Sequence, residues 1–330
     1  MCANEILANL GREMKRTILV IHPGALGDVL LAVPAIWELR ARHPQHQLVL
    51  CARGSVAQVL LECKVIDAWV SVEGSVWTGV FDKDRPLKGE LKDWLSRCDR
   101  AIAWMHDERG NLASVLRKAG ARRTIVSSPF ATDLKATHQS DRFCEIANVS
   151  PASMVSFKPL RLPGEMRSRG RTCLENAAIG LDRPLVAVHP GSGSPQKSVA
   201  VVTMAGMIAK IQGEGAVPIV IEGPADREAV HNLIGETSSP ITVIRTLDLR
   251  TVAGVLSHAK LFVGHDSGVT HLSALLGVPT ISIFGPTDPE RWAPLGSHVT
   301  VIKWSPSSVF DMISFLDRHL SAGCTSCPNS

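Results

Sequence analysis

The sequence has 330 residues, of which 45% are hydrophobic and 20% are charged. This composition excludes a disordered or collagen-like chain, and the length suggests two domains of roughly 150 residues each. The 35 Lys and Arg residues exceed the 31 Asp and Glu residues by 35 − 31 = 4. Such a mild excess suits an anionic small ligand and argues against a nucleic-acid-binding protein.

The first half of the chain alternates β-rich and helix-like segments. Thr17–Ile21 is an expected strand, followed by a glycine-containing turn and the apolar helical stretch Val29–Leu39. Further strands are expected at Gln47–Cys51, Ala101–Met105 and Thr124–Val126. This alternation predicts a parallel sheet covered by helices.

The pattern starts again at Leu185–Val188 in the second half. The later strands are expected at Pro218–Glu222, Thr242–Ile244, Leu261–Val263 and Thr280–Phe284, and a closing helix at Ser307–Leu320. Between the halves, residues 158–171 lack periodicity and hold five basic residues against one Glu. We interpret this stretch as a linker, with a patch for lipid headgroups as the alternative. The expected domains are therefore residues 1–160 and 175–330, and the closing helix is left free to pack back on the first domain.

A short repeat relates the two halves. Residues 20–24 read VIHPG and residues 186–191 read VAVHPG, each an apolar strand that runs into a glycine-bearing turn. Two tandem Rossmann-like α/β domains would place a cleft between the carboxyl ends of two sheets, where ligands of such folds bind.

The cellular location of the protein is predicted from the absence of membrane and secretion signals and from its cysteines. No apolar run approaches the roughly 20 residues of a membrane helix. The first sixteen residues carry charges where a secretory signal has its apolar segment. The eight Cys are scattered, several of them inside apolar stretches, as with Cys51 and Cys98. That usage is typical of reduced thiols, so we expect a cytoplasmic protein.

The first candidate motif is the segment GALGD at residues 24–28. It follows a strand and places Asp28 at a helix start, where an N-cap role is the structural alternative. Its two glycines let the backbone pass close to a ligand beside a carboxylate. The third glycine of the dinucleotide fingerprint is missing, so the segment does not indicate a nicotinamide or flavin site.

A second motif, HPGSGSPQK, covers residues 189–197. It follows a strand and offers backbone N–H groups, hydroxyls and one lysine, a combination that holds phosphate in many proteins. The spacing differs from that of a P-loop. A plain Gly/Ser connector is the alternative.

The third motif is the richest and begins where the strand Leu261–Val263 is expected to end. Asp266 is followed by Ser267 and Gly268, with a helix expected to begin near Val269. The N–H groups of its first turn suit a diphosphate, and Asp266 suits the hydroxyls of a sugar. The next strand ends in GPTDP at residues 285–289, a second rigid loop at the same sheet edge.

A weaker candidate is Glu228, which follows the strand Pro218–Glu222. Its carboxylate could accept hydrogen bonds from both hydroxyls of a ribose. An exposed glutamate at a helix start is the equally good alternative.

Taken together, these motifs resemble glycosyltransferase family 9, the heptosyltransferases of lipopolysaccharide core assembly. The resemblance rests on GxxGDxL, HPGSGxxxK and DSGVTHL with FGPTDP, and covers residues 17 to 300. It implies a GT-B fold, with the acceptor on the first domain and the nucleotide sugar on the second. It further implies transfer of heptose from ADP-L-glycero-D-manno-heptose to Kdo or heptose of the inner core, with inversion and without a metal.

The resemblance also assigns roles to residues. Asp28 matches the catalytic carboxylate, a general base, and Lys197 matches the diphosphate-binding lysine. Glu228 matches the ribose-contacting acid, with Asp226 close enough to compete, and Asp266 matches the sugar-contacting acid. The remaining substrate-binding candidates are Gly27, Ser192, Ser267, Gly268, Thr270 and His271. One departure is that the family's Lys-x-Trp pattern is Lys197-Ser198-Val199 here.

The resemblance implies an ADP-heptose donor, a lipid A–Kdo type acceptor and peripheral contact with the inner membrane, with no cofactor, metal or nucleic acid. Two metal-like patterns are set aside. Asp82-Lys83-Asp84 has a lysine between its acids, and Cys324 and Cys327 have no second cysteine pair. The alternatives are another nucleotide-sugar transferase, a GT-B-like sugar-nucleotide epimerase, or a non-catalytic nucleotide-sugar-binding protein.

Overall fold

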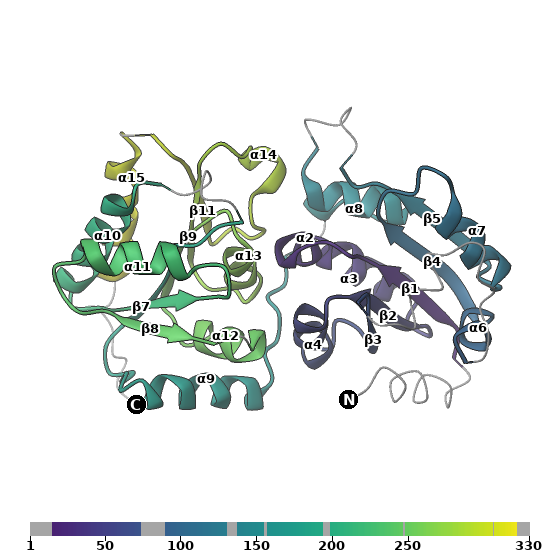
Figure 1. Cartoon of the computed structure of the whole chain (residues 1–330), viewed down its shortest axis with the longest axis horizontal. Helices are drawn as coiled ribbons and strands as arrows, with labels where there is room; N and C mark the ends of the chain where they lie inside the picture. Colours follow the sequence, from purple (N-terminus) through teal and green to yellow (C-terminus); the bar gives the residue numbers. More distant parts are fainter. Residues whose placement is uncertain are drawn as a thin grey trace. The chain divides into compact units, whose positions relative to one another are not determined.

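The computed structural model (Figure 1) describes residues 15–73, 90–130, 137–154, 157–193, 199–246, 248–305 and 307–321. The chain divides into two compact units, residues 1–156 and 157–330. Each unit is built on one parallel sheet. Within the described part of the chain, every helix is too short or too polar to traverse a membrane.

The sheet of the first unit has five strands in the order β3-β2-β1-β4-β5. These are β1 Thr17–Ile21, β2 Gln47–Ala52, β3 Ala68–Ser71, β4 Cys98–Trp104 and β5 Arg123–Ser127. The helices are α2 Leu26–Leu31, α3 Val33–Arg42, α4 Gly54–Glu62, α6 Glu90–Leu95, α7 Asn111–Lys118 and α8 Gln139–Ala147, with a 3-10 turn at Ala152–Met154. All five residues of β1 are buried, as expected for a parallel strand covered on both faces.

Two apolar layers hold this unit together. Leu19 and Ile21 of β1 pack with Trp94 of α6 and Leu116 of α7 on one face of the sheet. Helices α2, α3 and α8 lie next to one another against the opposite face (Figure 1). The alternating apolar side chains of the strands therefore supply both layers.

The sheet of the second unit has six strands in the order β11-β10-β9-β6-β7-β8. These are β6 Leu185–His189, β7 Val217–Glu222, β8 Thr242–Arg245, β9 Leu261–His265, β10 Thr280–Phe284 and β11 Val299–Lys303. The helices are α9 Gly164–Asn176, α10 Val201–Gly213, α11 Arg227–Glu236, α12 Leu249–Leu256, α13 Gly268–Leu275, α14 Pro289–Trp292 and α15 Ser308–Ser321.

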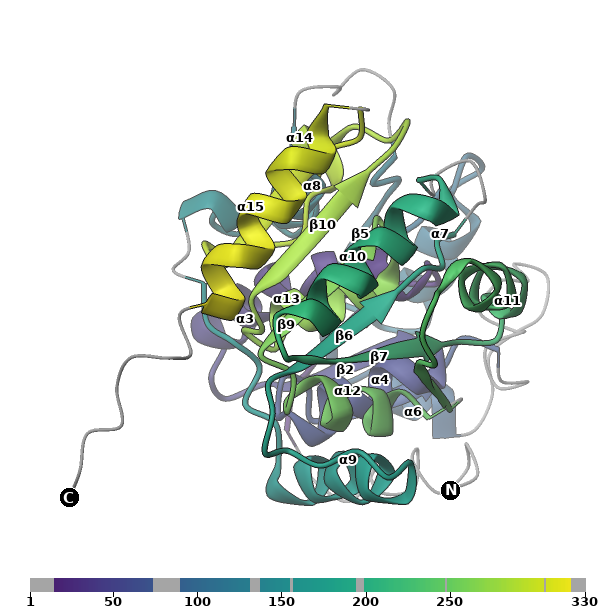
Figure 2. The same ribbon diagram turned by 90° about the vertical axis from the view of Figure 1, so that its left-hand side faces the viewer.

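Helices α10, α11 and α15 cover one face of this sheet, the face toward the viewer in Figure 2. Met312, Phe315 and Leu316 of α15 are buried in the same apolar cluster as the strands. The apolar face of α15 is therefore covered within the second unit.

Helix α9 lies against α12, with two glycines at the contact. A Cβ on Gly170 would lie 2.0 Å from the carbonyl carbon of Gly254, so the backbones of the two helices touch directly. Residues 164–171, which the sequence assigned to a linker, are thus part of a packed helix. The linker interpretation of these residues was wrong. Helix α9 buries only Met166, Gly170 and Leu174, so no continuous apolar run marks it in the sequence.

Each sheet reverses its strand order at one point, between β1 and β4 in the first unit and between β6 and β9 in the second. Ligands of open α/β sheets bind outside the carboxyl ends of the strands at such points. The segment of Asp28 follows β1, and the segments of Ser192 and Asp266 follow β6 and β9. The candidate residues therefore lie at the reversal points of their sheets.

Candidate functional site

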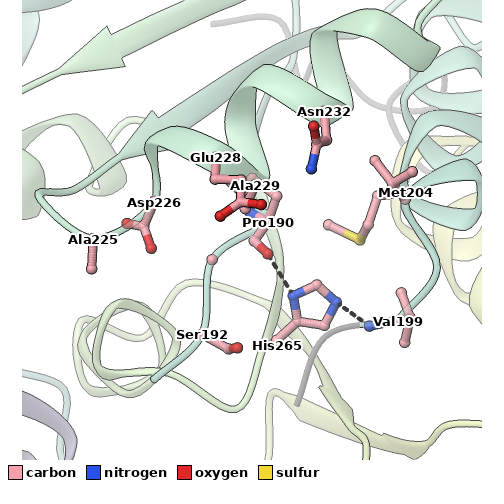
Figure 3. A pocket seen from close by; sticks show the side chains of 12 residues that line it. Pro190, Ser192, Val199, Met204, Ala225, Asp226, Glu228, Ala229, Asn232 and His265 are labelled. Carbon is pink, nitrogen blue, oxygen red and sulfur yellow. Dashed lines mark hydrogen bonds between the residues drawn. The ribbon is translucent and has the colours of Figure 1, made fainter. Parts of the chain in front are cut away.

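A pocket of about 240 Å³ lies at the carboxyl ends of β6, β7 and β9 (Figure 3). It is lined by Pro190, Gly191, Ser192, Val199, Val201, Met204, Ala225, Asp226, Glu228, Ala229, Asn232 and His265. Two candidates from the sequence, Ser192 and Glu228, are thus brought to one cavity from separate loops. Asp226 and His265 lie there with them.

Two polar side chains come to this pocket from α11. Glu228 and Asn232 are four residues apart and therefore lie on one side of the helix (Figure 3). Apolar side chains, Val199, Val201 and Met204, form another part of the wall. An acid beside an apolar wall suits a nucleoside, whose ribose donates hydrogen bonds and whose base is flat and weakly polar.

The carboxylate of Asp226 contacts other groups of the protein. Its Oδ2 accepts a hydrogen bond from the N–H of Gly223 at 2.8 Å, and the Nε2 of His189 lies 3.8 Å from the same oxygen. The Nδ1–H of His189 donates to the carbonyl of Ile221 at 3.1 Å. Burial lowers the pKa of His189, and the nearby Asp226 carboxylate opposes that shift. Asp226 is 8% exposed, whereas Glu228 is exposed, so Glu228 is the better placed of the two acids to meet a ribose.

The position of Asp226 explains why residue 191 is a glycine. A Cβ on Gly191 would lie 1.8 Å from Oδ1 of Asp226, so a side chain at position 191 would overlap the carboxylate. Gly191 therefore lets the segment after β6 pass directly beside the segment after β7.

His265, at the end of β9, is a residue that the sequence analysis missed. Its Nδ1–H donates to the carbonyl of Pro190 at 3.0 Å, and its Nε2 accepts from the N–H of Val199 at 3.1 Å (Figure 3). Both ring nitrogens are therefore used by a neutral imidazole. Burial, followed by the neighbouring His189, lowers the pKa of His265 to about 4.

The N-terminus of α13 follows directly. Ser267 is its N-cap and its Oγ accepts from the N–H of Thr270 at 3.4 Å. The Thr270 hydroxyl donates to the carbonyl of His265 at 2.5 Å and lies 3.0 Å from the Ser267 hydroxyl. Since Thr270 gives its proton to the carbonyl, Ser267 donates to Thr270. Both hydroxyls thus shape the turn, and the N–H groups of Gly268 and Val269 are the donors that the first turn offers to an anion.

Asp266 and His271 form a buried pair beside this turn. Oδ1 of Asp266 lies 3.8 Å from Nε2 of His271, and the two residues are 7% and 5% exposed. The N–H of Asp266 donates to the carbonyl of Ile283 at 3.1 Å. The structure therefore brings these two candidates together where β9 and β10 end.

In the first unit, Asp28 lies inside the first turn of α2. The helix has Ala25 as its N-cap, and Oδ2 of Asp28 accepts from the N–H of Ala25 at 3.2 Å. The alternative interpretation of Asp28 as an N-cap is therefore wrong in position, because the carboxylate caps the helix from its third residue. Gly27 lies in the same turn, and Asp28 is half-buried.

The segment before α2 is held by His22. Its Nδ1 accepts from the N–H of Gly24 at 3.1 Å, and its ring packs against Trp104 and Phe143 with centroids 5.6 and 5.0 Å away. Burial lowers the pKa of His22 to about 4. A Cβ on Gly24 would lie 2.6 Å from Cε1 of His22 and 3.1 Å from Cβ of Asp28. The backbone that leads to Asp28 is therefore fixed on both sides.

Some predictions fall outside the described residues. These are Lys197, the pattern Asp82-Lys83-Asp84, and the cysteines Cys324 and Cys327. Among the residues that the structure describes, no group of three or more His, Cys, Asp or Glu side chains is arranged to hold a metal ion.

The comparisons with known proteins agree on one class, the glycosyltransferases. The sequence model of the family described as "Glycosyltransferase family 9 (heptosyltransferase)" matches residues 159–309. The chain is 22% identical to a putative glycosyltransferase of Haemophilus influenzae, over 88% of this chain and 89% of that protein. It is 23% identical to lipopolysaccharide heptosyltransferase 2 of Salmonella typhimurium, over 87% of each chain.

Solved structures show the same fold. A glycosyltransferase family 9 protein of Veillonella parvula superposes with a TM-score of 0.74 at 21% identity, over 91% of this chain and 89% of that one. The E. coli ADP-heptose lps heptosyltransferase II gives 0.72 at 18% identity, over 93% and 99%. The two parallel α/β sheets are thus those of a GT-B glycosyltransferase. More narrowly, the second unit carries the match to glycosyltransferase family 9, and lipopolysaccharide heptosyltransferases are among the proteins similar to most of the chain.

Proposed function

We propose that this enzyme transfers a heptose from ADP-L-glycero-D-manno-heptose to the Kdo or heptose sugars of the lipopolysaccharide inner core. In this proposal residues 1–160 bind the acceptor and residues 175–330 bind the donor. The observation that carries it is the pocket that brings Ser192 and Glu228 together with His265 beside the strand-order reversal of the second sheet, with the N-terminus of α13 following His265 in the chain. Relatives named lipopolysaccharide heptosyltransferase, and a structural relative described with an ADP-2-deoxy-2-fluoro heptose, support the choice of donor.

The donor side follows from the chemistry of these groups. Glu228 accepts hydrogen bonds from the ribose hydroxyls, and the first-turn N–H groups of α13 meet the diphosphate. Asp266 and His271 lie beside that turn and contact the sugar. A lysine and a helix N-terminus supply positive charge to the departing diphosphate, so the reaction proceeds without a metal. We assign that lysine to Lys197.

The acceptor side depends on Asp28. An aspartate has a reference pKa of about 4 and is ionised at neutral pH. Its carboxylate takes the proton from the acceptor hydroxyl while that oxygen attacks the anomeric carbon. The bond from the anomeric carbon to the diphosphate oxygen breaks on the opposite face, which inverts the configuration. Because its acceptor is lipid-linked, the enzyme works in the cytoplasm at the inner face of the membrane.

The test is acceptor-dependent release of ADP from ADP-heptose, measured with a Kdo-containing lipid acceptor in the presence of excess EDTA. We expect turnover with acceptor and only slow hydrolysis without it. A donor sugar that changes configuration without acceptor would indicate an epimerase. Binding without any release would indicate a non-catalytic protein, and a rate that vanishes in EDTA and returns with Mg²⁺ would overturn the metal-independent mechanism.

A further inference from the structure

We propose that His22 is a positioning residue, which holds the turn before α2 so that the carboxylate of Asp28 keeps one orientation. The inference rests on the proposed function, because it requires that Asp28 is the general base. His22 comes directly after β1, and Asp28 is the third residue of α2. Both residues lie in the first unit.

The two side chains hold neighbouring N–H groups of the same turn. The N–H of Gly24 donates to Nδ1 of His22 at 3.1 Å, and the N–H of Ala25 donates to Oδ2 of Asp28 at 3.2 Å. Gly24 and Ala25 share a planar peptide group that contains the N–H of Ala25. A shift of Gly24 therefore also moves the donor that orients the Asp28 carboxylate.

The two side chains also approach each other at Gly24. A Cβ on Gly24 would lie 2.6 Å from Cε1 of His22 and 3.1 Å from Cβ of Asp28. Both distances are shorter than a normal van der Waals contact, so the backbone at Gly24 passes close to both side chains. The position of the His22 ring is therefore felt directly by the turn that carries Asp28.

Aromatic packing holds the His22 ring in place. Its centroid lies 5.6 Å from that of Trp104, at the end of β4, and 5.0 Å from that of Phe143 on α8. The rings of Trp104 and Phe143 are 5.1 Å apart, so the three rings are mutual neighbours. His22 is 1% exposed. The acceptor atom Nδ1 is thus part of a rigid, buried cluster.

The chemistry explains why a histidine suits this position. Burial lowers the pKa of His22 to about 4, so the ring is neutral at pH 7 and Nδ1 accepts a hydrogen bond. Asparagine has its Oδ1 on Cγ, where histidine has Nδ1, and can accept from the same N–H. Leucine fills the space but offers no acceptor, which leaves the N–H of Gly24 without this partner.

The experiment measures kcat and KM for acceptor-dependent release of ADP, and ADP affinity by calorimetry. If His22 positions Asp28, His22→Leu lowers kcat by about 10-fold to 10²-fold, the scale of a misplacement of up to 1 Å. ADP affinity stays unchanged, because the donor is assigned to the second unit. His22→Asn keeps kcat within about threefold of the parent. His22→Phe, which also lacks the acceptor, replaces His22→Leu if that chain does not fold.

A double variant separates positioning from general stability. If His22 acts through Asp28, the chain with both His22→Leu and Asp28→Asn is no slower than Asp28→Asn alone. Independent effects would multiply instead. Leu116→Val is the control for lost packing, because Leu116 is buried on the other face of the sheet. We expect it to lower the melting temperature and leave kcat unchanged.

Three results would overturn the inference: a kcat of His22→Leu within about threefold of the parent, an equal loss in His22→Asn and His22→Leu, or losses that multiply in the double variant. A slow Asp28→Asn beside a normal His22→Leu would end this inference alone. A parent chain that transfers no heptose, or an Asp28→Asn chain as fast as the parent, would end the proposed function and this inference with it.

Discussion

Each unit has the tripeptide His-Pro-Gly where its first strand ends. The Nδ1 atoms of the two histidines have opposite hydrogen-bonding roles. His22 uses Nδ1 to accept a backbone N–H from Gly24. His189 uses Nδ1 to donate to the carbonyl of Ile221. Both are buried, so burial alone does not decide which nitrogen carries the proton; the backbone group opposite Nδ1 does.

The two histidines also differ in their surroundings. His22 lies among aromatic rings, Trp104 and Phe143, while His189 faces the carboxylate of Asp226. The first unit thereby holds its loop by packing and by the carboxylate of Asp28. The second unit holds its loops by polar contacts around a pocket. In the proposed function the first unit supplies the base and the second unit binds the donor.

The strongest test of this contrast is Asp28→Asn. An amide cannot take the acceptor proton, so we expect turnover to fall by about 10²–10⁴-fold. The amide oxygen can still accept from the N–H of Ala25, so the melting temperature and ADP affinity should be unchanged. Asp141→Asn is the matched control, since Asp141 also accepts a backbone N–H, that of Ser153 at 3.0 Å. Turnover of Asp28→Asn within about threefold of the parent would end the assignment.

The second unit is tested by Gly191→Ala. The new methyl would overlap Oδ1 of Asp226, and we expect a loss of about 3 kcal/mol in the free energy of unfolding together with weaker ADP binding. Gly193→Ala is the control, because a Cβ there meets nothing within 4 Å. Denaturant unfolding of both variants measures the difference. Equal stability of the two would show that the segment after β6 does not need to lie against Asp226.

The sheets were predictable from sequence because their central strands are continuous apolar runs. The edge strands β3 and β11 were missed, whereas the edge strands β5 and β8, which bury no more residues, were predicted. The stretch Val29–Leu39 was expected as one helix and is two. The break falls at Ala32, because Pro34 occupies the first turn of α3 and has no N–H to continue a helix.

Where one short segment carries its own chemistry, as with Asp28 and Asp266, the sequence alone is enough to propose a site residue. The site was not predictable where the partner is distant in the chain. His265 forms hydrogen bonds with Pro190 and Val199, which are 75 and 66 residues away in the sequence. No pattern within a short segment predicts such contacts. Thr270, a substrate-binding candidate, is fully buried, and its hydroxyl donates to the carbonyl of His265.

The buried histidine of the first unit predicts a pH dependence of stability. The pKa of His22 falls from 6.5 to about 4 on folding, so the unfolded chain binds the proton more tightly. This contribution to stability is complete above pH 6.5 and is lost as the pH falls from 6.5 toward 4. At pH 5 the loss amounts to about 2 kcal/mol.

The variant His22→Asn checks this prediction. Its Oδ1 can accept from the N–H of Gly24, but the side chain does not titrate. We therefore expect the drop in unfolding free energy between pH 7 and pH 5 to be smaller in this variant by about 2 kcal/mol. His258→Asn serves as the control for a half-buried histidine. An unchanged drop in His22→Asn would mean that His22 is not the group that titrates; His189 and His265, whose pKa values are also lowered, would then account for it.

The smallest expected effect concerns the donor side alone. If Lys197 binds the diphosphate as proposed, replacing it by alanine removes one charge-assisted hydrogen bond, while the N–H groups of α13 remain. We expect ADP affinity to fall by about tenfold, or about 1.4 kcal/mol, with adenosine affinity unchanged. Lys210→Ala is the control, because Lys210 is paired with Glu214 and Asp317 on the surface of α10. If calorimetry shows the same ADP affinity for Lys197→Ala and the parent, Lys197 does not contact the diphosphate, and the charge there comes from α13 and other cations. A loss for both nucleotides would instead place Lys197 beside the nucleoside and move the diphosphate site to α13 alone.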